Sequence, residues 1–493
     1  MGKAFDTIVV VCKDTPLDWY DVRQFTISIS SSSFRVDLRL NIAWQTFFVN
    51  PRKRRKQSPG GGPPRPSEEK IPFFCDFHLQ YRQAEVFLTS VIEKLRKGGM
   101  TMRVDVREYY SENSWKALKS EADRHDTPCL IVDLDRIRRK YAELKEYFPF
   151  AKVYYAVKAN PAVEVLELLR DLGSNFDIAS RYELDRVLSL GIAPERISYG
   201  NTIKKRTDIR YFYEKGVRLF ATDSEPDLRN IGKEAPGSRV FCRVLTEGSE
   251  TADWPLSRKF GCHPDMAIDL LTLARELGLK PAGVSFHVGS QQREIGTWDS
   301  AIAKVRYIFD YLEGEGIKPD LINMGGGFPA SYISKTNTMD VYADEITRYL
   351  EEDFGENLPE IILEPGRSLV GEAGIIASEV VLVSQKSTTG LDRWLYLDVG
   401  KFNGLIETWD ESIKYPLYCE ARGEACEDFI IAGPTCDSQD VMYEYFRNPL
   451  PAYIKSGDRV YWLSCGAYTS SYASVEFNGF PPLPVYFVDS GKK

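Results

Sequence analysis

The chain has 493 residues, of which 43% are hydrophobic and 27% charged, a balance typical of a globular protein with two or three domains. Its net charge of −8 argues against a general nucleic-acid-binding protein, and no apolar run approaches the length of a membrane span. The nine cysteines include no CxxC pair, and the four histidines lack metal-ligand spacing, so no disulfide framework and no metal site is predicted. Charged residues interrupt the N-terminal apolar stretch, so we expect no signal peptide and a cytoplasmic protein.

Residues 1–102 differ in composition from the rest of the chain. A basic run at 52–56 leads into a Gly/Pro-rich stretch at 58–66 that cannot pack a core. An amphipathic pattern predicts a short helix over Gln83–Lys97. We expect residues 1–102 to be an N-terminal extension that is largely disordered, or a misassigned segment upstream of a natural start at Met100 or Met102.

From residue 151 the pattern alternates between strands and helices. Strands are predicted at 152–157, 175–179, 197–200, 218–222, 239–245, 283–288, 321–325 and 360–364, with helices such as Val163–Asp171 and Met266–Leu277 between them. Eight such units in succession predict an α/β fold with a (β/α)8 barrel over 148–368. Further strands at 129–134, 375–384, 393–398, 429–432 and 459–463 predict a β-sandwich or β-barrel-like domain. Residues 103–147 and 369–493 would build this domain, with the barrel inserted between them.

A single lysine, Lys158, closes the first predicted barrel strand in the octet YYAVKANP (154–161). Burying an ammonium group is costly and lowers its pKa, which suits an amine that must be neutral and nucleophilic. Such lysines form Schiff bases with carbonyl compounds, pyridoxal phosphate (PLP) among them. The alternative is an exposed lysine at a strand end.

Other polar residues also fall at predicted strand ends, where barrel enzymes place their chemistry: Asp177, His287, Gly325 and Glu364. The run Gly325-Gly326-Gly327 allows backbone N–H groups to approach a phosphate, although a bare glycine run is more often a tight turn. Arg367 could bind a phosphate with its two-pronged guanidinium, and Glu364 could keep a pyridine nitrogen protonated. A local salt bridge between Glu364 and Arg367 is the alternative.

His287 and Cys436 have both a structural and a chemical interpretation. The ring of His287 could stack on a flat cofactor, with Ser290 reaching the phosphate, or His287 could be a hydrogen-bonded core residue. Cys436 stands among turn-forming residues beside Asp437, where exposure and proton transfer are plausible. Most cysteines are instead buried structural residues.

Several segments, in this order along the chain, resemble those of the fold type III (alanine racemase-type) PLP-dependent ornithine/lysine decarboxylase family. They are YYAVKANP, FDIASRYEL, WPLSRKFGC, VSFHVGS, INMGGGFP, ILEPGR, LDVGKFNGLIET, AGPTCDSQD and GAYTSSYASVEFNGF. They span about residue 105 to the C-terminus. The LDVGKFNGLIET segment most resembles the bacterial lysine/ornithine decarboxylases.

The resemblance implies a role for each matching residue. Lys158, Cys436, His287 and Glu364 would be catalytic, with Cys436 protonating the α-carbon after CO2 leaves. The cofactor-binding residues would be Lys158, Asp177, Arg243, His287, Ser290, Gly325, Gly326, Gly327, Glu364, Arg367 and Tyr468. The substrate-binding residues would be Asp437 and Phe477, together with Glu407 or Asp410 for the distal amine. The family's Cys-Asp loop enters the neighbouring subunit's site, which implies an obligate homodimer with shared active sites.

The function implied is the conversion of L-ornithine or L-lysine, or both, to putrescine or cadaverine and CO2 in polyamine biosynthesis. The segment Phe402–Pro416 is longer than the eukaryotic pattern, so the choice between lysine and ornithine stays open. Diaminopimelate decarboxylase is one alternative, but its CES-type cysteine loop differs from Pro434–Asp437. A catalytically inactive regulatory homologue is the other, although Lys158, Glu364 and Cys436 are all present.

Overall fold

The computed structural model describes residues 24–32, 35–43, 103–247, 251–255, 259–355, 358–389, 392–420 and 425–491. Strands β1 (Gln24–Ser32) and β2 (Arg35–Ala43) pair as an antiparallel hairpin that the sequence pattern did not predict. The basic run at 52–56 and the helix predicted over Gln83–Lys97 lie outside the described residues. The described residues divide into two units, one within residues 1–77 and the other within residues 78–493, and all that follows concerns the second.

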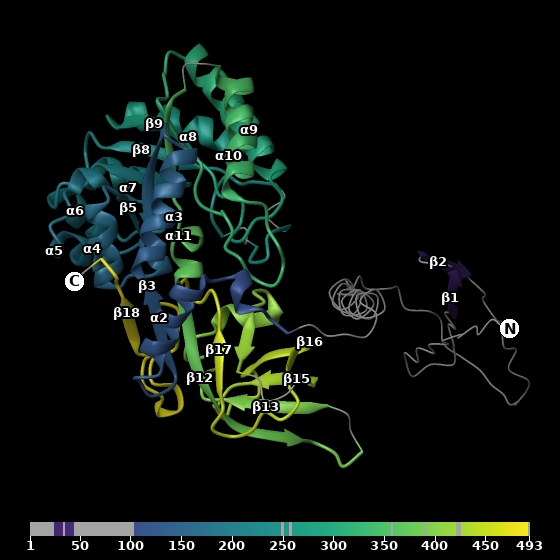
Figure 1. Ribbon diagram of the computed structural model, residues 1–493. Helices are drawn as coiled ribbons and strands as arrows, with labels where there is room; N and C mark the ends of the chain where they lie inside the picture. Colours follow the sequence, from purple (N-terminus) through teal and green to yellow (C-terminus); the bar gives the residue numbers. More distant parts are fainter. Residues whose placement is uncertain are drawn as a thin grey trace, which may run out of the picture. The chain divides into compact units, whose positions relative to one another are not determined.

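Eight parallel strands close into a barrel, as the sequence predicts (Figure 1). In chain order they are β4 (Ala151–Ala156), β5 (Asn175–Ile178), β6 (Ile197–Tyr199), β7 (Leu219–Thr222), β8 (Arg239–Arg243), β9 (Lys280–Ser285), β10 (Leu321–Asn323) and β11 (Glu360–Leu363). The pairing of Ile361 in β11 with Ala151 in β4 closes the ring. The strands begin and end within a few residues of the predicted bounds because each is a short apolar run bounded by turn residues.

Helices surround the barrel and bury their apolar stripes against its outer face. They are α3 (Leu134–Tyr147), α4 (Val163–Asp171), α5 (Arg181–Ser189), α6 (Arg206–Glu214), α7 (Glu225–Glu234), α8 (Pro264–Glu276), α9 (Gly296–Gly314) and α10 (Met339–Phe354). A separate small cluster fills the inside of the barrel, with Tyr154, Leu219 and Phe241 among its members. Side chains alternate between the inside and the outside of the barrel along each strand. Phe241 therefore belongs to the inner cluster, and its neighbour Cys242 belongs to the larger core outside it.

The second domain is a mixed sheet built from both sides of the barrel sequence. Its strands are β3 (Cys129–Asp133), β12 (Gly374–Gln385), β13 (Arg393–Leu397), β14 (Leu417–Cys419), β15 (Cys426–Ala432), β16 (Val441–Pro451), β17 (Arg459–Trp462) and β18 (Val485–Val488). Strand β3, which precedes the barrel, pairs with β12, which follows it, and with β18 near the C-terminus. The barrel is therefore inserted in the sheet domain, as predicted. Among the described residues, no helix has the length and apolar character needed to span a membrane.

Three strands of this domain were not predicted, and each lacks a clear strand signal. Strand β14 has only three residues, and β16 carries two prolines, Pro449 and Pro451. Strand β18 is short and only half-buried, so its burial depends on pairing with β3. Helix α2 (Glu112–Ala122) covers this sheet with Leu118 and Ala122, which are fully buried.

A buried carboxylate, Glu372, joins helix α3 to the chain that leaves the barrel. Arg136 of α3 donates to it at 2.5 Å, the hydroxyl of Ser331 donates at 2.8 Å, and the Lys140 ammonium lies 3.6 Å away. Burial alone would raise the pKa of Glu372, but the charges of Lys140 and Arg136 outweigh burial and lower that pKa to about 2. The ionised carboxylate therefore stabilises the fold.

We predict that Glu372→Gln destabilises the protein in a pH-dependent way. The folded pKa lies below the unfolded one, so the stabilisation is fully present above pH 5 and is lost as the pH falls toward 2. The difference in unfolding free energy should be on the order of 3 kcal/mol at pH 7 and should shrink toward zero near pH 2. Urea unfolding of both proteins at several pH values measures it. Glu352→Gln, which removes an exposed partner of Arg348, is the control and should change little. A difference that stays constant with pH would contradict this account.

Candidate active site

Lys158 lies directly after β4, in a short helical turn (Val157–Ala159), at the C-terminal mouth of the barrel. Residues from the C-terminal part of the chain hold this turn. The backbone N–H of Tyr468 donates to the carbonyl of Ala159 at 2.9 Å, and the Ser471 hydroxyl donates to the carbonyl of Lys158 at 3.0 Å. The side chain of Lys158 is reachable by solvent, although protein groups surround it.

The charges around Lys158 overturn one sequence expectation. Burial, the largest effect, lowers the pKa of Lys158, but Tyr468, Asp177 and Glu364 together raise the pKa above its ordinary value. The prediction that burial leaves this amine with a low pKa is therefore wrong. The carboxylates instead favour the protonated amine, so its conversion to a nucleophile depends on what else binds at the mouth.

Asp177 is one of these carboxyl groups and lies within β5, where it is buried. The Ser198 hydroxyl donates to Asp177 Oδ1 at 3.0 Å. Gly200 leaves the space for this carboxyl, because a Cβ at Gly200 would lie 2.0 Å from Oδ1. Burial and then the charge of Glu364 raise the pKa of Asp177 well above its ordinary value.

Glu364, the first residue after β11, is oriented by Asn323, a residue that the sequence analysis missed. Asn323 Nδ2 donates to Glu364 Oε1 at 2.5 Å, and Asn323 Oδ1 accepts from the backbone N–H of Gly325 at 2.9 Å. One buried amide side chain thus fixes both the carboxylate and the start of the glycine run. The only signal for this role is a polar residue at the end of the apolar strand Leu321–Asn323.

The glycine run forms a loop whose backbone conformation and close contacts require glycine at each of its three positions. Gly325 and Gly327 have φ of +64° and +103°. A Cβ on Gly326 would lie 2.6 Å from the carbonyl oxygen of Glu364. Within the described residues, the N–H groups of Gly326 and Gly327 have no acceptor. These two N–H groups can therefore bind an anion.

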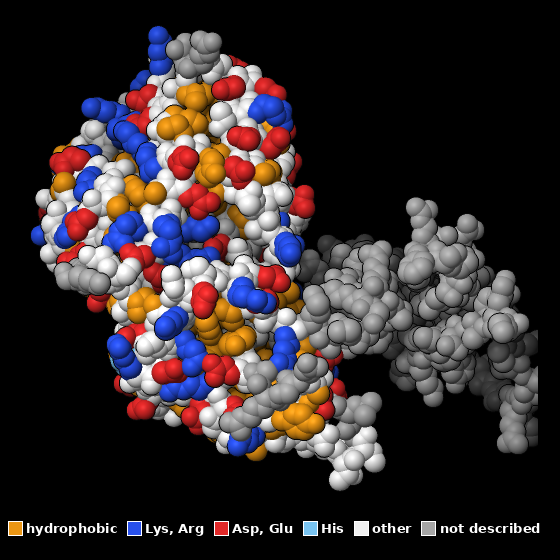
Figure 2. Space-filling view, viewed as in Figure 1, with side chains coloured by type: hydrophobic (Ala, Val, Ile, Leu, Met, Phe, Trp, Pro, Cys, Tyr) orange, Lys and Arg blue, Asp and Glu red, His pale blue; other side chains and the backbone are white. Residues whose placement is uncertain are grey.

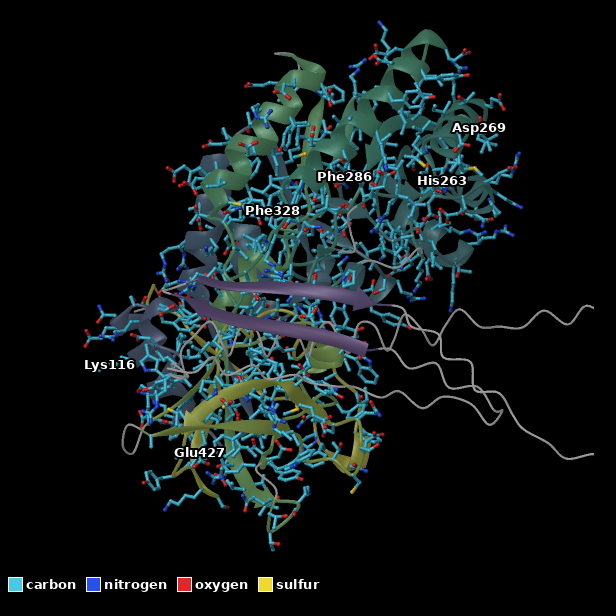
Figure 3. The ribbon with its side chains drawn as sticks, turned by 90° about the vertical axis from the view of Figure 1, so that its right-hand side faces the viewer. Lys116, His263, Asp269, Phe286, Phe328 and Glu427 are labelled. Carbon is cyan, nitrogen blue, oxygen red and sulfur yellow. The ribbon has the colours of Figure 1, made fainter. Side chains whose placement is uncertain are left out.

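His287 faces this loop, two residues beyond the end of β9. A Cβ on Gly326 would lie 3.5 Å from His287 Nε2, which shows how close the ring and the loop are. The backbone N–H of Gly289 donates to Nδ1 at 3.0 Å, so a neutral ring carries its proton on Nε2. Burial, followed by the charges of Arg243 and Lys158, lowers the pKa of His287 well below its ordinary value. Its neighbour Phe286 and, beyond the glycine loop, Phe328 are buried in the large core outside the barrel's inner cluster (both are labelled in Figure 3).

Arg367 is bound by Glu407, one of the two carboxylates that the resemblance suggests for the distal amine of the substrate. Its guanidinium donates to both oxygens of Glu407, at 2.6 and 2.8 Å, and the two side chains are only 2% and 3% exposed. The other N–H groups donate to the hydroxyls of Ser290 and Tyr332. Glu407 is therefore not free for a substrate amine, and the alternative salt bridge between Glu364 and Arg367 is not formed. Ser290 keeps its own proton to donate to an anion.

Two further predicted residues complete the same region. The ring of Tyr468 lies 4.9 Å from the Arg367 guanidinium, and its backbone has a φ of +55°. Arg243 ends β8, and burial lowers its pKa while Glu364 and Asp177 oppose that effect. We call this set of residues the lysine cluster: Lys158, Asp177, Arg243, His287, Ser290, Gly325–Gly327, Glu364, Arg367 and Tyr468.

Cys436, Asp437 and Phe477 lie in a second group, which we call the cysteine cluster together with Phe402. Cys436 and Asp437 are exposed on the loop between β15 and β16. The backbone N–H of Cys436 donates to Asn478 Oδ1 at 2.9 Å, and the rings of Phe402 and Phe477 are 4.9 Å apart. In the described part of the chain, no hydrogen bond or ion pair links Cys436 or Asp437 to the lysine cluster.

A buried aspartate that the sequence analysis missed, Asp440, fixes the cysteine loop. It accepts from the backbone N–H of Lys401 at 2.8 Å and from the N–H and hydroxyl of Thr435 at 3.0 and 2.7 Å. Gly400 and Gly433 leave room for it, since a Cβ on either would lie within 2.5 Å of its oxygens. The exposed thiol is thus carried on a rigid base.

The lysine cluster fits PLP. Lys158 supplies the amine for the aldehyde carbon, and the glycine N–H groups with Ser290 supply donors for a phosphate. Glu364, which Asn323 orients, supplies a carboxylate for the ring nitrogen, and His287 supplies a neutral ring to lie against a flat cofactor.

Comparisons with known proteins agree with this geometry. Residues 134–371 match the family described as pyridoxal-dependent decarboxylase, pyridoxal binding domain. The lysine/ornithine decarboxylase of Selenomonas ruminantium is 32% identical over 372 residues, covering 75% of this chain and 92% of that protein. The solved structure of lysine/ornithine decarboxylase from Vibrio vulnificus, complexed with cadaverine, has a TM-score of 0.68 at 27% identity and covers 77% of this chain and 100% of its own. Antizyme inhibitor 2 of Xenopus laevis is 32% identical over 372 residues, covering 72% of this chain and 80% of that protein.

We predict that Gly326→Ala weakens PLP binding at least about 10-fold, because the added Cβ would lie 2.6 Å from the carbonyl of Glu364 and displace the loop. Titration of the apo-protein with PLP, followed by absorbance, measures the affinity. The control is Gly314→Ala, where a Cβ meets nothing within 4 Å, and it should bind PLP normally. Equal affinities for the two variants would show that the loop does not hold the cofactor.

Proposed function

The chain belongs to the PLP-dependent ornithine/lysine decarboxylase family, and we propose that it decarboxylates L-ornithine, L-lysine or both, to putrescine or cadaverine and CO2. The observation that supports this most strongly is the set of charges around Lys158. An amine lies with Asp177 and Glu364 at the mouth of the barrel, and Asn323 fixes the Glu364 carboxylate. We place this activity in polyamine biosynthesis.

Five residues of the lysine cluster have a defined task in this proposal. Lys158 holds the cofactor through its amine, and the N–H groups of Gly326 and Gly327 hold the phosphate. Glu364 keeps a proton on the ring nitrogen, since Asn323 holds its carboxylate in one orientation. When bound, PLP supplies an electron sink for the electron pair that CO2 leaves behind. The low pKa of His287 keeps its ring neutral, so it lies against the cofactor without repelling the nearby cations Arg243 and Lys158.

The cysteine cluster would complete the reaction. The exposed thiol of Cys436 delivers a proton to the α-carbon after CO2 has left, and Asp437 binds the distal ammonium of the substrate. The rings of Phe402 and Phe477 would pack against the methylene chain. Because Asp440 and Asn478 fix the backbone of the cysteine loop, the Cys436 thiol would approach the α-carbon of the substrate from one face only.

We propose that the working form is a homodimer in which the cysteine cluster of one subunit completes the lysine cluster of the other. Supporting this, Cys436 and Asp437 are exposed and share no hydrogen bond or ion pair with the lysine cluster in the described residues. Apolar side chains near the cysteine cluster are also exposed, with Val475 at 83% and Tyr472 at 48%. On the face drawn in Figure 2, hydrophobic side chains likewise gather over the sheet domain.

The compartment we propose is the cytoplasm. The cysteines at 129, 242, 262, 436 and 465 are free thiols, as a reducing compartment keeps them.

A regulatory homologue without activity is the second candidate, because the chain is similar to antizyme inhibitor 2. The presence and arrangement of Lys158, Glu364 and Cys436 favour the enzyme.

We predict that purified protein with PLP forms putrescine from ornithine or cadaverine from lysine, and that Lys158→Ala abolishes the product. Chromatography of the amines identifies the product, with diaminopimelate and arginine offered as controls. The ratio of kcat/KM values for lysine and ornithine assigns the substrate. PLP binding without turnover of either substrate would refute the proposed reaction, and absence of PLP binding would favour the regulatory homologue.

A second prediction concerns the shared site. Lys158→Ala and Cys436→Ala should each be inactive as homodimers, because each lacks one half of every site. Mixed and allowed to exchange subunits, they should recover about a quarter of the wild-type activity, since half of the dimers then contain one intact site. No recovery, in a mixture shown by native mass spectrometry to contain heterodimers, would place both residues in the same subunit's site.

A further inference from the structure

Two buried cysteines, Cys242 and Cys262, are in contact in the large core outside the barrel's inner cluster. Cys242 belongs to β8, and Cys262 lies two residues before α8 (the intervening His263 is labelled in Figure 3). The two sulfur atoms are 3.5 Å apart, and either thiol can donate to the other. The activity proposed above makes no use of this pair.

The segment Phe260–Cys262 is fastened to the end of β8. The backbone N–H of Cys262 donates to the carbonyl of Arg243 at 3.0 Å, and the carbonyl of Cys262 accepts from the N–H of Leu245 at 2.9 Å. Gly261 has a φ of +90°, and a Cβ there would lie 2.9 Å from the backbone that continues β8. Only glycine allows so close an approach, and this approach brings the two thiols together.

Arg243, a residue of the lysine cluster, follows Cys242 in the chain and contacts the same segment. The thiol of Cys262 donates to the Arg243 carbonyl at 3.5 Å, and the ring of Phe260 is 5.1 Å from the Arg243 guanidinium. The positive charge of Arg243 acts on Lys158 and on His287. A change at the thiol pair therefore reaches the lysine cluster through one residue.

The two thiols differ in accessibility and in ionisation. Cys242 is fully buried, whereas Cys262 is 9% exposed, so a small oxidant meets Cys262 first. The hydrogen bond with Cys262, together with burial, raises the pKa of Cys242 well above its ordinary value. Cys242 therefore keeps its proton until its neighbour is oxidised. A thiol held against an oxidised sulfur attacks it without diffusion, so the contact favours a disulfide over further oxidation.

We propose that Cys242 and Cys262 are a redox-active thiol pair, which hydrogen peroxide converts to a disulfide that displaces Arg243 and so weakens the binding of PLP. This inference goes beyond the proposed function, because the disulfide can form whatever reaction the lysine cluster performs.

The oxidation proceeds in two steps and consumes one peroxide. In the first, the O–O bond of the peroxide breaks, the Cys262 thiol becomes a sulfenic acid and one water forms. In the second, the Cys242 sulfur attacks the sulfenic sulfur, the S–S bond forms and the S–O bond breaks. The hydroxyl leaves with the Cys242 proton as a second water. The two thiols lose two electrons, and the peroxide gains them.

The disulfide changes the contacts that hold Arg243. Sulfur atoms in a disulfide are about 2.05 Å apart, so the two sulfurs must approach from their present 3.5 Å. Gly261 already touches the backbone of β8, so the end of that strand shifts together with the segment Phe260–Cys262. Cys262 also loses the proton that it donates to the Arg243 carbonyl.

The test uses the full chain with Cys436→Ala, because the exposed thiol of Cys436 would otherwise react as well. The holoenzyme is treated with hydrogen peroxide, and a digest made without reductant is searched by mass spectrometry for peptides joined through Cys242 and Cys262. The dissociation constant of PLP is measured by absorbance before oxidation, after it and after dithiothreitol. Oxidation should weaken PLP binding at least about 5-fold, part of what the loss of a contact to a charged group does. Dithiothreitol should restore the affinity.

Two variants and a matched control assign the effect. Cys262→Ala and Cys242→Ala, each in the same background, should form no joined peptide and should keep their PLP affinity in peroxide. Cys129→Ala removes a fully buried thiol of the sheet domain and should respond to peroxide as its parent does.

The joined peptide and a loss of affinity that dithiothreitol reverses support the proposal, and both are read in the parent even if a variant is unstable. Absence of the joined peptide after excess peroxide overturns the proposal. A disulfide that leaves PLP affinity unchanged overturns it too, as does an equal loss of affinity in Cys262→Ala or a loss that dithiothreitol does not reverse.

Discussion

Closing eight parallel strands into a ring brings all their carboxyl ends to one mouth, and the rest of the site depends on that constraint. The closure brings together charged residues that lie far apart in the sequence. The charges of Asp177 and Glu364 act on Lys158 and on Arg243, and the charges of Glu364 and Lys158 act on Asp177. Burial disfavours the charged form of Lys158, Asp177 and Arg243. The neighbouring charges reverse this effect only for Lys158, whose pKa is raised, while the pKa of Asp177 stays well above its ordinary value and that of Arg243 stays below its own.

Several side chains that take part in no reaction step hold the residues of the site in position. Asn323 joins Glu364 to the glycine loop, Asp440 joins the cysteine loop to Gly400 and Lys401, and Glu407 holds Arg367. Each is buried and uses its hydrogen-bonding capacity within the protein, so each replaces a flexible contact by a fixed one. The reactive groups Lys158 and Cys436 remain accessible to solvent by contrast.

The sequence predicted the parts of the molecule that local patterns determine. The eight barrel strands and helix α4 follow from apolar runs and helical spacing, and the strand-end positions of Lys158 and Glu364 follow from them. Strands β14, β16 and β18 were missed because their burial comes from tertiary pairing and not from pattern. The roles of Asn323 and Asp440 depend on groups distant in sequence, which spacing does not reveal. For the same reason the pattern could not separate Glu407 from Asp410, whose difference is only the buried partner Arg367.

The central claim is that the mouth of the barrel holds PLP on Lys158, and chemical trapping tests it most directly. The holoenzyme is treated with borohydride, which reduces a lysine-bound pyridoxal to a stable amine, and the modified peptide is located by mass spectrometry. Our account predicts the pyridoxyl group on the peptide that contains Lys158 and on no other lysine. A pyridoxyl group on Lys204 or Lys401, two lysines with buried side chains, would contradict the account, as would the absence of any modified peptide.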